Sequence, residues 1–566
     1  MPNAGAARRC GRATHVDLLT VVLAAMLCWA SYTLSIWHNS RGAADSSVLG
    51  LVVGATVCGD ADEELDFEAR HAADDAGLSV SSGPANSRVR RALSSSGPAP
   101  AAAGTTVSRY RAPFPWPASR GVVWAGNSAR GAKAAADAAA AANKWARVDG
   151  DMLRFTDAAA VRAYAYVVLR LVAAPVRAAV DVGAMHGGSW AAELMSRGVV
   201  TVSVAAPWGA SDGAALVELA LERGVPAVLA AAGGAPSRRL PFPAGAFDMA
   251  HCGRCLVPWH LHGKHFPSSR TRRAVLDGDR PRAPARRLLG PLGAPANGTH
   301  ERAAIEAAAA SMCWRSVADQ NGFTVWQKPV GHVGCDAGEN SPRFCAGQNK
   351  KFKWDSDVEP CITPIQEGAA PPREASAAEA LRRDSETWTR RVARYKAVAT
   401  QLGQKGRLRN LLDMNARRGG FAAALADDPV WVMSVVPATG GGDTDTDTLP
   451  AIYDRGLIGA YHDWCEPLPT PALSYDLLHA DSLFTMYRDR CDMEDILLEM
   501  DRILRPGRAV IIRDDIAILA RIKNFLTDRM RWDCQIFDGE DGSDDREKIL
   551  FAAKTCCNDE DRDQEQ

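Results

Sequence analysis

The sequence has almost no net charge. Its 566 residues include 66 Lys and Arg against 67 Asp and Glu, which leaves a formal net charge of -1 at pH 7. A chain without a strong positive field has no long-range attraction to nucleic acid, so we predict no nucleic-acid partner. Any polyanionic partner must then be bound by a local basic patch.

Two common ligand-binding patterns are also missing. The strict pattern GxGxxG does not occur, so the sequence carries no fingerprint for a dinucleotide. Cys and His residues gather in one stretch, but their spacing matches no closed zinc site. They are His251, Cys252, Cys255, His260, His262 and His265. We predict no metal site, and zinc at this stretch is the alternative.

The chain is long enough for more than one hydrophobic core, since single domains usually stop growing near about 250 residues. Residues 18–36 contain no charged side chain, and a helix of about 20 such residues can cross a bilayer. Basic residues precede this segment and acidic residues follow it, which places the N-terminus in the cytosol. We predict a cytosolic tail over 1–15, a transmembrane signal anchor over 16–37 and a luminal remainder. A cleavable signal peptide, the alternative, has a shorter apolar core.

The sequence after the predicted anchor has the composition of a flexible segment. Residues 38–110 are rich in Ala, Ser, Gly and Asp without sustained periodicity, which predicts a luminal stem. A second stretch of this kind, the Cys- and Pro-containing linker 333–390, separates two blocks of regular pattern. An acidic tail over 556–566 ends the chain.

The cysteines and one glycosylation motif agree with a luminal location. Fourteen cysteines suit an oxidising compartment, although they do not fix the disulfide pairing. A disulfide within the linker could stabilise a region that has little core of its own, and its candidate residues are Cys335, Cys345 and Cys361. Asn297 begins Asn-Gly-Thr, a glycosylation acceptor if it is luminal and exposed.

Two blocks of the sequence repeat one another. DVGAMHGGSWAA begins at Asp181 and DMNARRGGFAAA begins at Asp413, and the two align without a gap. Each follows a short apolar run of the kind found in buried parallel strands. An Arg-Gly pair comes next, with its Gly 43 residues after the Asp in both blocks, and then AFDMAH or SYDLLH. We therefore predict a duplicated unit, with halves over 111–332 and 391–555.

The order of predicted elements in each half gives the fold class. Strands alternate with helices, which predicts an α/β protein of two tandem Rossmann-like units, each a largely parallel sheet flanked by helices. EDILLEMDRILRPGRAVIIRDD predicts an amphipathic helix that stops at Pro506-Gly507, followed by the strand AVII. In the first half, residues 260–290 are rich in Arg, Pro and His, and the expected helix and strand are missing there. A local reading-frame error is one hypothesis for this stretch.

Each glycine turn is a candidate cofactor site. Ligands of parallel sheets bind outside the carboxyl ends of the strands, where these turns lie. Gly lets the backbone approach a ligand, and the helix N-terminus behind it favours negative charge. The alternative is that the glycines only allow tight packing. The candidate cofactor-binding residues are Asp181, Gly183, Gly187, Gly188 and Asp248 in the first half and Asp413, Gly419, Gly420 and Asp476 in the second.

Several longer motifs carry a family resemblance. ALERGVPA, LPFPAGAFDMAHCGRCLVPW, DDPVWVMSVVP, YDRGLIGAYHDWCE and DRCDMEDILLEMDRILRP resemble the plant methyltransferase family typified by the Golgi pectin methyltransferases, with coverage from Phe114 to Lys554. The resemblance implies a class I methyltransferase fold, S-adenosylmethionine as cofactor, and methyl transfer onto carboxylates of pectin (homogalacturonan). It also implies a single-pass type II protein of the Golgi membrane, whose partners are a pectin-like polysaccharide and other wall-biosynthetic enzymes.

This chemistry needs no general base. A carboxylate acceptor is already ionised above about pH 4, so positioning supplies most of the catalysis, and we predict no catalytic dyad. His251 and His479, one strand end each, are candidates for orienting the acceptor, and Arg254 is a candidate for pairing with its carboxylate. The alternatives are buried histidines bonded to backbone and a surface arginine.

Two other functions remain open from the sequence. A catalytically inactive relative would act as a luminal scaffold for other enzymes of wall-polysaccharide synthesis. The run GGGDTDTDT at 440–448 contains the DxD pattern with which Golgi glycosyltransferases bind a divalent metal and a sugar nucleotide. Its Gly and Thr repetition favours a solvated loop instead.

Overall fold

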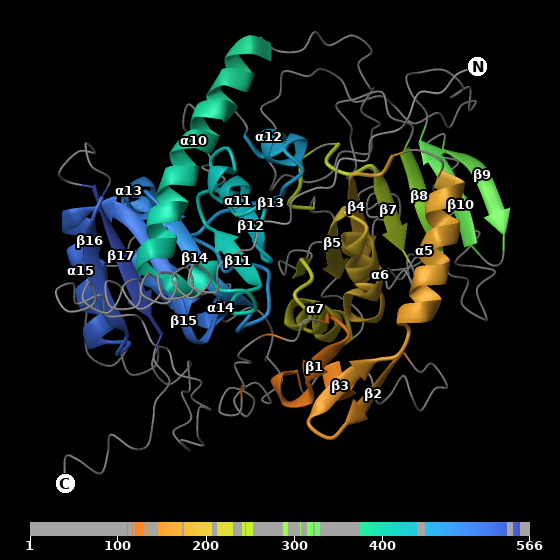
Figure 1. Cartoon of the computed structure of the whole chain (residues 1–566), viewed down its shortest axis with the longest axis horizontal. Coiled ribbons are helices and arrows are strands. Elements are labelled where there is room, and N and C mark those ends of the chain that lie inside the picture. Colours follow the sequence, from red (N-terminus) through yellow and green to blue (C-terminus); the bar gives the residue numbers. More distant parts are fainter. Residues whose placement is uncertain are drawn as a thin grey trace, which may run out of the picture. The chain divides into compact units, whose positions relative to one another are not determined.

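Figure 1 shows the protein as a computed structural model. The structure describes residues 110, 116, 119–128, 131–133, 145–172, 175–205, 212–229, 240–243, 245–252, 287–292, 306, 309, 314–320, 323–328, 374–437, 448–539 and 547–554. The predicted tail, anchor, stem before residue 110, acidic tail, linker cysteines, Arg254, Asn297 and nearly all of the DxD run lie outside these residues. Among the described helices, none combines the length and apolar character needed to cross a bilayer.

A small antiparallel sheet precedes the two large ones. It consists of β1 (Val122–Trp124), β2 (Ala146–Asp149) and β3 (Met152–Phe155), with β3 in the middle. Its buried residues Val123, Leu153 and Phe155 share a core with Leu219 of α7 (Asp212–Glu222). The small sheet therefore packs against a helix of the first half.

The first large sheet has seven strands in the order β6-β5-β4-β7-β8-β10-β9. Its strands are β4 (Ala178–Val182), β5 (Val200–Ala205), β6 (Ala227–Leu229), β7 (Met249–Cys252), β8 (Arg287–Leu292), β9 (Arg315–Gln320) and β10 (Phe323–Lys328). The strands from β6 to β8 are parallel, and β10 is antiparallel to both of its neighbours. The helices of this half are α5 (Ala158–Val172), α6 (Met185–Ser196) and α7.

The second large sheet has its seven strands in the order β13-β12-β11-β14-β15-β17-β16. They are β11 (Asn410–Asp413), β12 (Trp431–Pro437), β13 (Ile458–His462), β14 (Tyr475–Asp481), β15 (Leu504–Asp515), β16 (Asp533–Asp538) and β17 (Glu547–Ala553). When the strands of each sheet are numbered from one to seven in chain order, both sheets have the order 3-2-1-4-5-7-6. In both, the parallel strands are followed by an antiparallel pair at one edge. Each half therefore has a largely parallel sheet flanked by helices.

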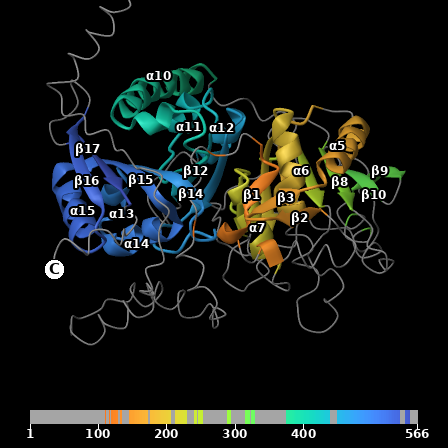
Figure 2. The ribbon, with the colours of Figure 1, turned by 60° about the horizontal axis from the view of Figure 1, so that its bottom comes forward.

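Alternate residues of the second sheet face helices on opposite sides. Leu411 packs with Trp388 of α10 (Glu374–Val398) and Phe421 of α11 (Gly420–Ala424). Leu412 packs in the core that includes α14 (Met493–Ile503) and α15 (Ile516–Asp528). Figure 2 shows α10 and α11 on one side of this sheet and α14 and α15 on the other. The period of two along a strand thus gives the sheet two buried faces.

One expectation about the first half is wrong. β8 overlaps the end of the stretch 260–290, in which we expected no strand. Leu289 pairs with Ala250 of β7 on one side and with Trp326 of β10 on the other. The short apolar run that ends this Arg- and Pro-rich stretch is sufficient to complete the parallel part of the sheet.

Two predicted boundaries also differ from the structure. The boundary between linker and second half, at residues 390 and 391, falls inside α10, whose Trp388, Val392 and Tyr395 are buried against the sheet. The helix predicted before Pro506-Gly507 ends earlier, at Ile503, and β15 begins at Leu504. Pro506 therefore lies inside an irregular first part of the strand, where the pairing to β14 shifts register.

Candidate functional site

The two glycine turns lie at the switch points of the two sheets. The chain runs outward from β4 to β5 and β6, and then returns to β7 on the other side of β4; β11 and β14 have the same relation. Ligands of open α/β sheets bind at the carboxyl ends of such strands. At this edge, Asp181 is the second-last residue of β4 and Asp413 is the last residue of β11.

In the first half, Asp181 is the centre of a buried network. Its Oδ1 accepts a hydrogen bond from His251 Nδ1 at 2.8 Å, and its Oδ2 accepts from Ser203 Oγ at 3.2 Å and from the backbone N–H of Met185 at 3.1 Å. Tyr164 Oη lies 3.2 Å from His251 Nε2. Burial, with the Asp181 charge as a second cause, raises the pKa of Tyr164, so its hydroxyl stays protonated and donates to His251.

The second half contains the same three residue types. His479 Nδ1 lies 2.9 Å from Asp413 Oδ1, and Tyr395 Oη lies 3.5 Å from His479 Nε2. In each half an aromatic ring stacks on the histidine at a centroid distance of 4.2 Å, Trp190 on His251 and Phe421 on His479. Each half therefore has an Asp-His-Tyr network whose Asp and His side chains are buried.

His251 and His479 are both fully buried. Each histidine has an Asp and a Tyr side chain as partners. The alternative prediction, a buried histidine bonded to backbone, is therefore right about burial and wrong about the partners. A fully buried ring cannot contact a polysaccharide, so their placement favours a role in joining the strand ends to α5 and α10. Arg254, the third acceptor candidate, lies outside the described residues.

The glycines of the turns face helices. Gly187 and Gly188 have φ of +62° and +78°, and an added Cβ would lie 2.9 Å from Leu219 Cβ and Ala220 Cβ of α7 respectively. In the second half, a Cβ on Gly420 would lie 2.0 Å from Trp388, and one on Gly419 would lie 3.1 Å from Ile452 of α12 (Leu449–Asp454). Close packing therefore accounts for Gly187, Gly188 and Gly420, whereas at Gly419 the φ of +76° adds to a milder clash. Gly183, with φ of +99°, donates its N–H to Val204 O at 2.7 Å.

An arginine supports each turn, and neither arginine is among the site residues predicted from the sequence. Arg223 Nη1 donates to the carbonyl oxygens of His186 at 3.3 Å and Gly187 at 2.9 Å. Arg455 Nη1 donates to the carbonyl oxygen of Arg418, the position equivalent to His186, at 2.7 Å. Burial lowers the pKa of Arg223 to about 10. The repeated Arg-Gly pair, at a constant distance from the Asp, was the sequence signal for this interaction.

Asp248 and Asp476 lie at the opposite edge of their sheets. Asp248 Oδ2 accepts the backbone N–H groups of Arg177 and Ala178 at 2.8 and 3.1 Å, just before and at the start of β4. Asp476 Oδ2 accepts those of Arg409 and Asn410 at 2.8 and 3.0 Å, at the start of β11. Because these are the amino ends of the strands, neither carboxylate is near a glycine turn. The prediction that Asp248 and Asp476 bind the cofactor together with the turn residues is therefore wrong, because they lie at the opposite edge of the sheets.

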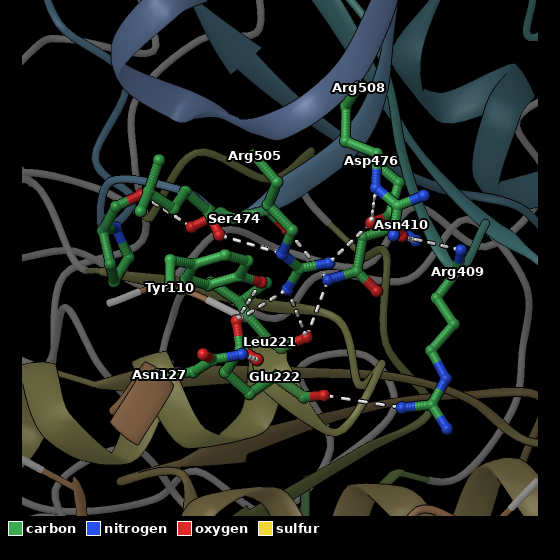
Figure 3. Close-up of polar contacts among 12 residues, drawn as sticks. Tyr110, Asn127, Leu221, Glu222, Arg409, Asn410, Ser474, Asp476, Arg505 and Arg508 are labelled. Carbon is green, nitrogen blue, oxygen red and sulfur yellow. Dashed lines mark hydrogen bonds and ion pairs between the residues drawn. The ribbon is translucent and has the colours of Figure 1, made fainter. Parts of the chain in front are cut away.

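Asp476 also belongs to a buried charged network that joins the two halves (Figure 3). Arg505 Nη1 lies 3.0 Å from Asp476 Oδ1, and its Nη2 lies 3.1 Å from Glu222 Oε1 at the end of α7. Tyr110 Oη donates to the same Glu222 oxygen at 3.0 Å. Burial by itself lowers the pKa of Arg505, but Tyr110, Glu222 and Asp476 more than reverse this effect.

The carboxyl edge of the second sheet carries a further charged cluster. Asp481, at the end of β14, has three guanidinium groups within ion-pair distance: Arg417 at 3.3 Å, Arg513 at 3.6 Å and Arg391 at 3.9 Å. The side chain of Arg417 is 50% exposed, whereas those of Arg513 and Asp481 are buried. The cluster therefore has one accessible cation beside the turn.

A disulfide lies in the same region. Cys465 and Cys491 are bonded, 26 residues apart in sequence. Next to Cys465, Trp464 Nε1 donates to the carbonyl oxygen of Met414 at 2.8 Å. The disulfide therefore restrains the segment that contacts the glycine turn. Among the described residues no group of three or more His, Cys, Asp and Glu is placed to hold a metal ion.

His462 gives a pH-dependent prediction. Its Nε2–H donates to Glu466 O at 2.9 Å, and burial lowers its pKa to about 4. The unfolded chain binds this proton near pH 6.5 and the folded one near pH 4, so stability falls as pH falls below 6.5, by about 2 kcal/mol at pH 5. Urea unfolding at pH 7.5 and 5 measures the loss. Between these pH values, the free energy of unfolding of His462→Asn should fall by about 2 kcal/mol less than that of the unmutated protein. Equal losses in the two proteins would show that His462 does not cause the pH dependence.

The sheet topology and the position of the turns define a class of protein. A largely parallel sheet flanked by helices, with an antiparallel pair at one edge and a Gly turn at the switch point, is the class I methyltransferase-like α/β fold. The chain belongs to the family described as "Putative S-adenosyl-L-methionine-dependent methyltransferase", whose model matches residues 100–376 and 369–554. The family predicted from the motifs is thereby confirmed, and S-adenosylmethionine is the cofactor of this family.

Several plant proteins are similar over most of the chain. "Probable methyltransferase PMT15" of Arabidopsis thaliana is 36% identical, over 96% of this chain and 95% of that protein. "Probable pectin methyltransferase QUA3" of the same plant is 32% identical, over 79% of this chain and 77% of that protein. Among solved structures, a Haemonchus contortus N-methyltransferase in complex with S-adenosylhomocysteine is 10% identical, with a TM-score of 0.25 over 70% of this chain and 99% of that one.

Proposed function

We propose that this protein transfers the methyl group of S-adenosylmethionine to carboxylates of a pectin-like polysaccharide in the Golgi lumen. The family membership and the similarity to a protein named as a pectin methyltransferase carry the proposal. The site agrees with it, because both histidines at the switch points are buried and a carboxylate acceptor needs no general base.

The two halves are proposed to be copies of one methyltransferase-like unit. Their identical strand order, the paired Asp-His-Tyr networks and the two arginine-supported turns support this interpretation. One of the two turns at the switch points, 181–188 or 413–420, is the proposed place for the cofactor. Bound S-adenosylmethionine would supply an electrophilic methyl group on its sulfonium.

The chain's own part in the reaction is to hold cofactor and acceptor in line and to exclude water. Arg417 has an exposed guanidinium at the carboxyl edge of the second sheet and is the proposed contact for an acceptor carboxylate. This role was assigned in the sequence analysis to Arg254. The Cys465–Cys491 disulfide supports the proposed luminal location, since disulfides persist in oxidising compartments.

A catalytically inactive scaffold is the second candidate function. The observation that favours it is the first turn, where both oxygens of Asp181 already have partners within the protein. Such a relative would keep the fold and bind other enzymes of wall synthesis without transferring a methyl group.

Methyl transfer by the full chain tests the proposal. The purified protein in detergent is incubated with methyl-labelled S-adenosylmethionine and with either de-esterified or fully esterified polygalacturonate. We expect label in ester form on the de-esterified polymer only. Cofactor binding by calorimetry without transfer to any polymer would favour the scaffold, and binding of UDP-sugar with Mn²⁺ alone would favour a glycosyltransferase.

A further inference from the structure

The two halves differ in how they use one pair of side chains. Asp181 and Ser203 are paired across β4 and β5, and Asp413 and Ser434 occupy the same positions across β11 and β12. In the first half, Ser203 Oγ donates to Asp181 Oδ2. In the second half, Asp413 Oδ2 and Ser434 Oγ are both buried and have no hydrogen-bond partner within the described part of the chain.

Unpartnered polar atoms at this position need an explanation. More than nine in ten buried polar groups in folded proteins have a hydrogen-bond partner, because leaving one without a partner is unfavourable. Asp413 also keeps its other oxygen on His479 at 2.9 Å, so the carboxylate is held in place. The unused oxygen lies at the carboxyl end of β11, where a cofactor is expected.

We infer that the second half holds the ammonium group of S-adenosylmethionine, through Asp413 Oδ2 and Ser434 Oγ. This inference rests on the proposed function and adds which half binds the cofactor. An ammonium has three N–H donors, so it can serve both oxygens at once. Adjacent strands lie about 4.8 Å apart, a span that one nitrogen with two hydrogen bonds of about 2.9 Å can bridge.

The first half is excluded from this role by its own contacts. Asp181 Oδ2 already accepts from Ser203 Oγ and from the N–H of Met185 in the turn. A ligand there would have to replace both donors. In the second half, the corresponding turn residue Arg417 contacts Asp481 and Ser482 through its side chain instead. Because Asp413 and Ser434 are buried, ligand entry requires the turn 413–420 to move.

The duplicated structure supplies a matched pair of variants for the test. Ser434→Ala and Ser203→Ala remove the same hydroxyl from equivalent positions. The full chain in detergent is titrated by calorimetry with S-adenosylmethionine and with 5′-methylthioadenosine, which lacks the amino-acid end of the cofactor. Thermal unfolding without ligand reports whether each variant is folded.

We expect Ser434→Ala to weaken S-adenosylmethionine binding about tenfold, as for a hydrogen bond to a charged group, and to leave methylthioadenosine binding unchanged. Ser203→Ala should leave both affinities unchanged. The inference is overturned if Ser203→Ala weakens cofactor binding and Ser434→Ala does not, or if neither does. Failure of the unmutated chain to bind S-adenosylmethionine would overturn the proposed function itself.

Discussion

Asp476→Asn is expected to destabilise the protein by about 3–5 kcal/mol, because it removes a buried negative charge from between two buried arginines. Asp476 Oδ1 lies 3.0 Å from Arg505 and 3.3 Å from Arg508, and all three side chains are 0% exposed. Burial raises the pKa of Asp476, but Arg505 and Arg508 outweigh burial, so the pKa lies below its ordinary value. After the substitution Arg505 keeps its ion pair with Glu222, whereas Arg508 loses the carboxylate that lies 3.3 Å from its Nε.

Asp248→Asn is the matched control for this prediction. Asp248 accepts the same kind of backbone N–H pair at the start of β4, but its ion pair with Arg177 is long, at 3.9 Å, and the Arg177 side chain is 68% exposed. An Asn oxygen can still accept these N–H groups, so we expect a loss of about 1 kcal/mol. Urea unfolding at pH 7 measures the loss in free energy of unfolding for both variants. Equal losses would show that the charge of Asp476 is not what stabilises the junction of the halves.

Gly188→Ala is expected to destabilise the protein by about 3 kcal/mol, through backbone strain and overpacking together. Gly188 has φ of +78°, and its new methyl group would lie 2.9 Å from Ala220 Cβ and 3.2 Å from Val225 Cγ1. The Cβ of Ala220 is fixed to the backbone of α7 and cannot rotate out of the way, so α6 and α7 must separate.

Gly198→Ala isolates the backbone part of this effect. Gly198 has φ of +77°, but an added Cβ there meets nothing within 4 Å. We expect a loss of about 1 kcal/mol from the left-handed backbone alone. Chemical unfolding of both variants gives the difference, which measures the packing of α6 on α7. If the two losses are equal, packing against α7 does not require Gly188.

The alternation of strands and helices was predictable, and so was the position of the turns. In the buried strands NLLD and YDLLHAD a short apolar run is followed by a polar residue at the strand end, and this pattern is typical of a buried parallel strand. The partners of the two histidines were not predictable. Tyr164 and Tyr395 lie on helices 87 and 84 residues before their histidines, and no local pattern distinguishes them from other core tyrosines.

The errors have physical causes of the same kind. Asp248 and Asp476 come before the apolar part of their strands, so they lie at the amino edge of the sheets. Because each Asp has the same spacing to the histidine that follows it, we predicted one common site. The boundary near residue 390 was placed too late, because α10 has many charged residues and its buried stripe, with Trp388, Val392 and Tyr395, is narrow. Contacts between distant segments decided both cases.

The junction between the halves has a consequence for how such a chain can change. Glu222 comes from the first half, Arg505 from the second, and Tyr110 from the segment that precedes both. A recombinant gene that joined the first half of this chain to a second half without Arg505 would leave the buried Glu222 without its arginine partner. Glu222 and Arg505 therefore have to vary together, so the junction couples sequence change in one half to sequence change in the other.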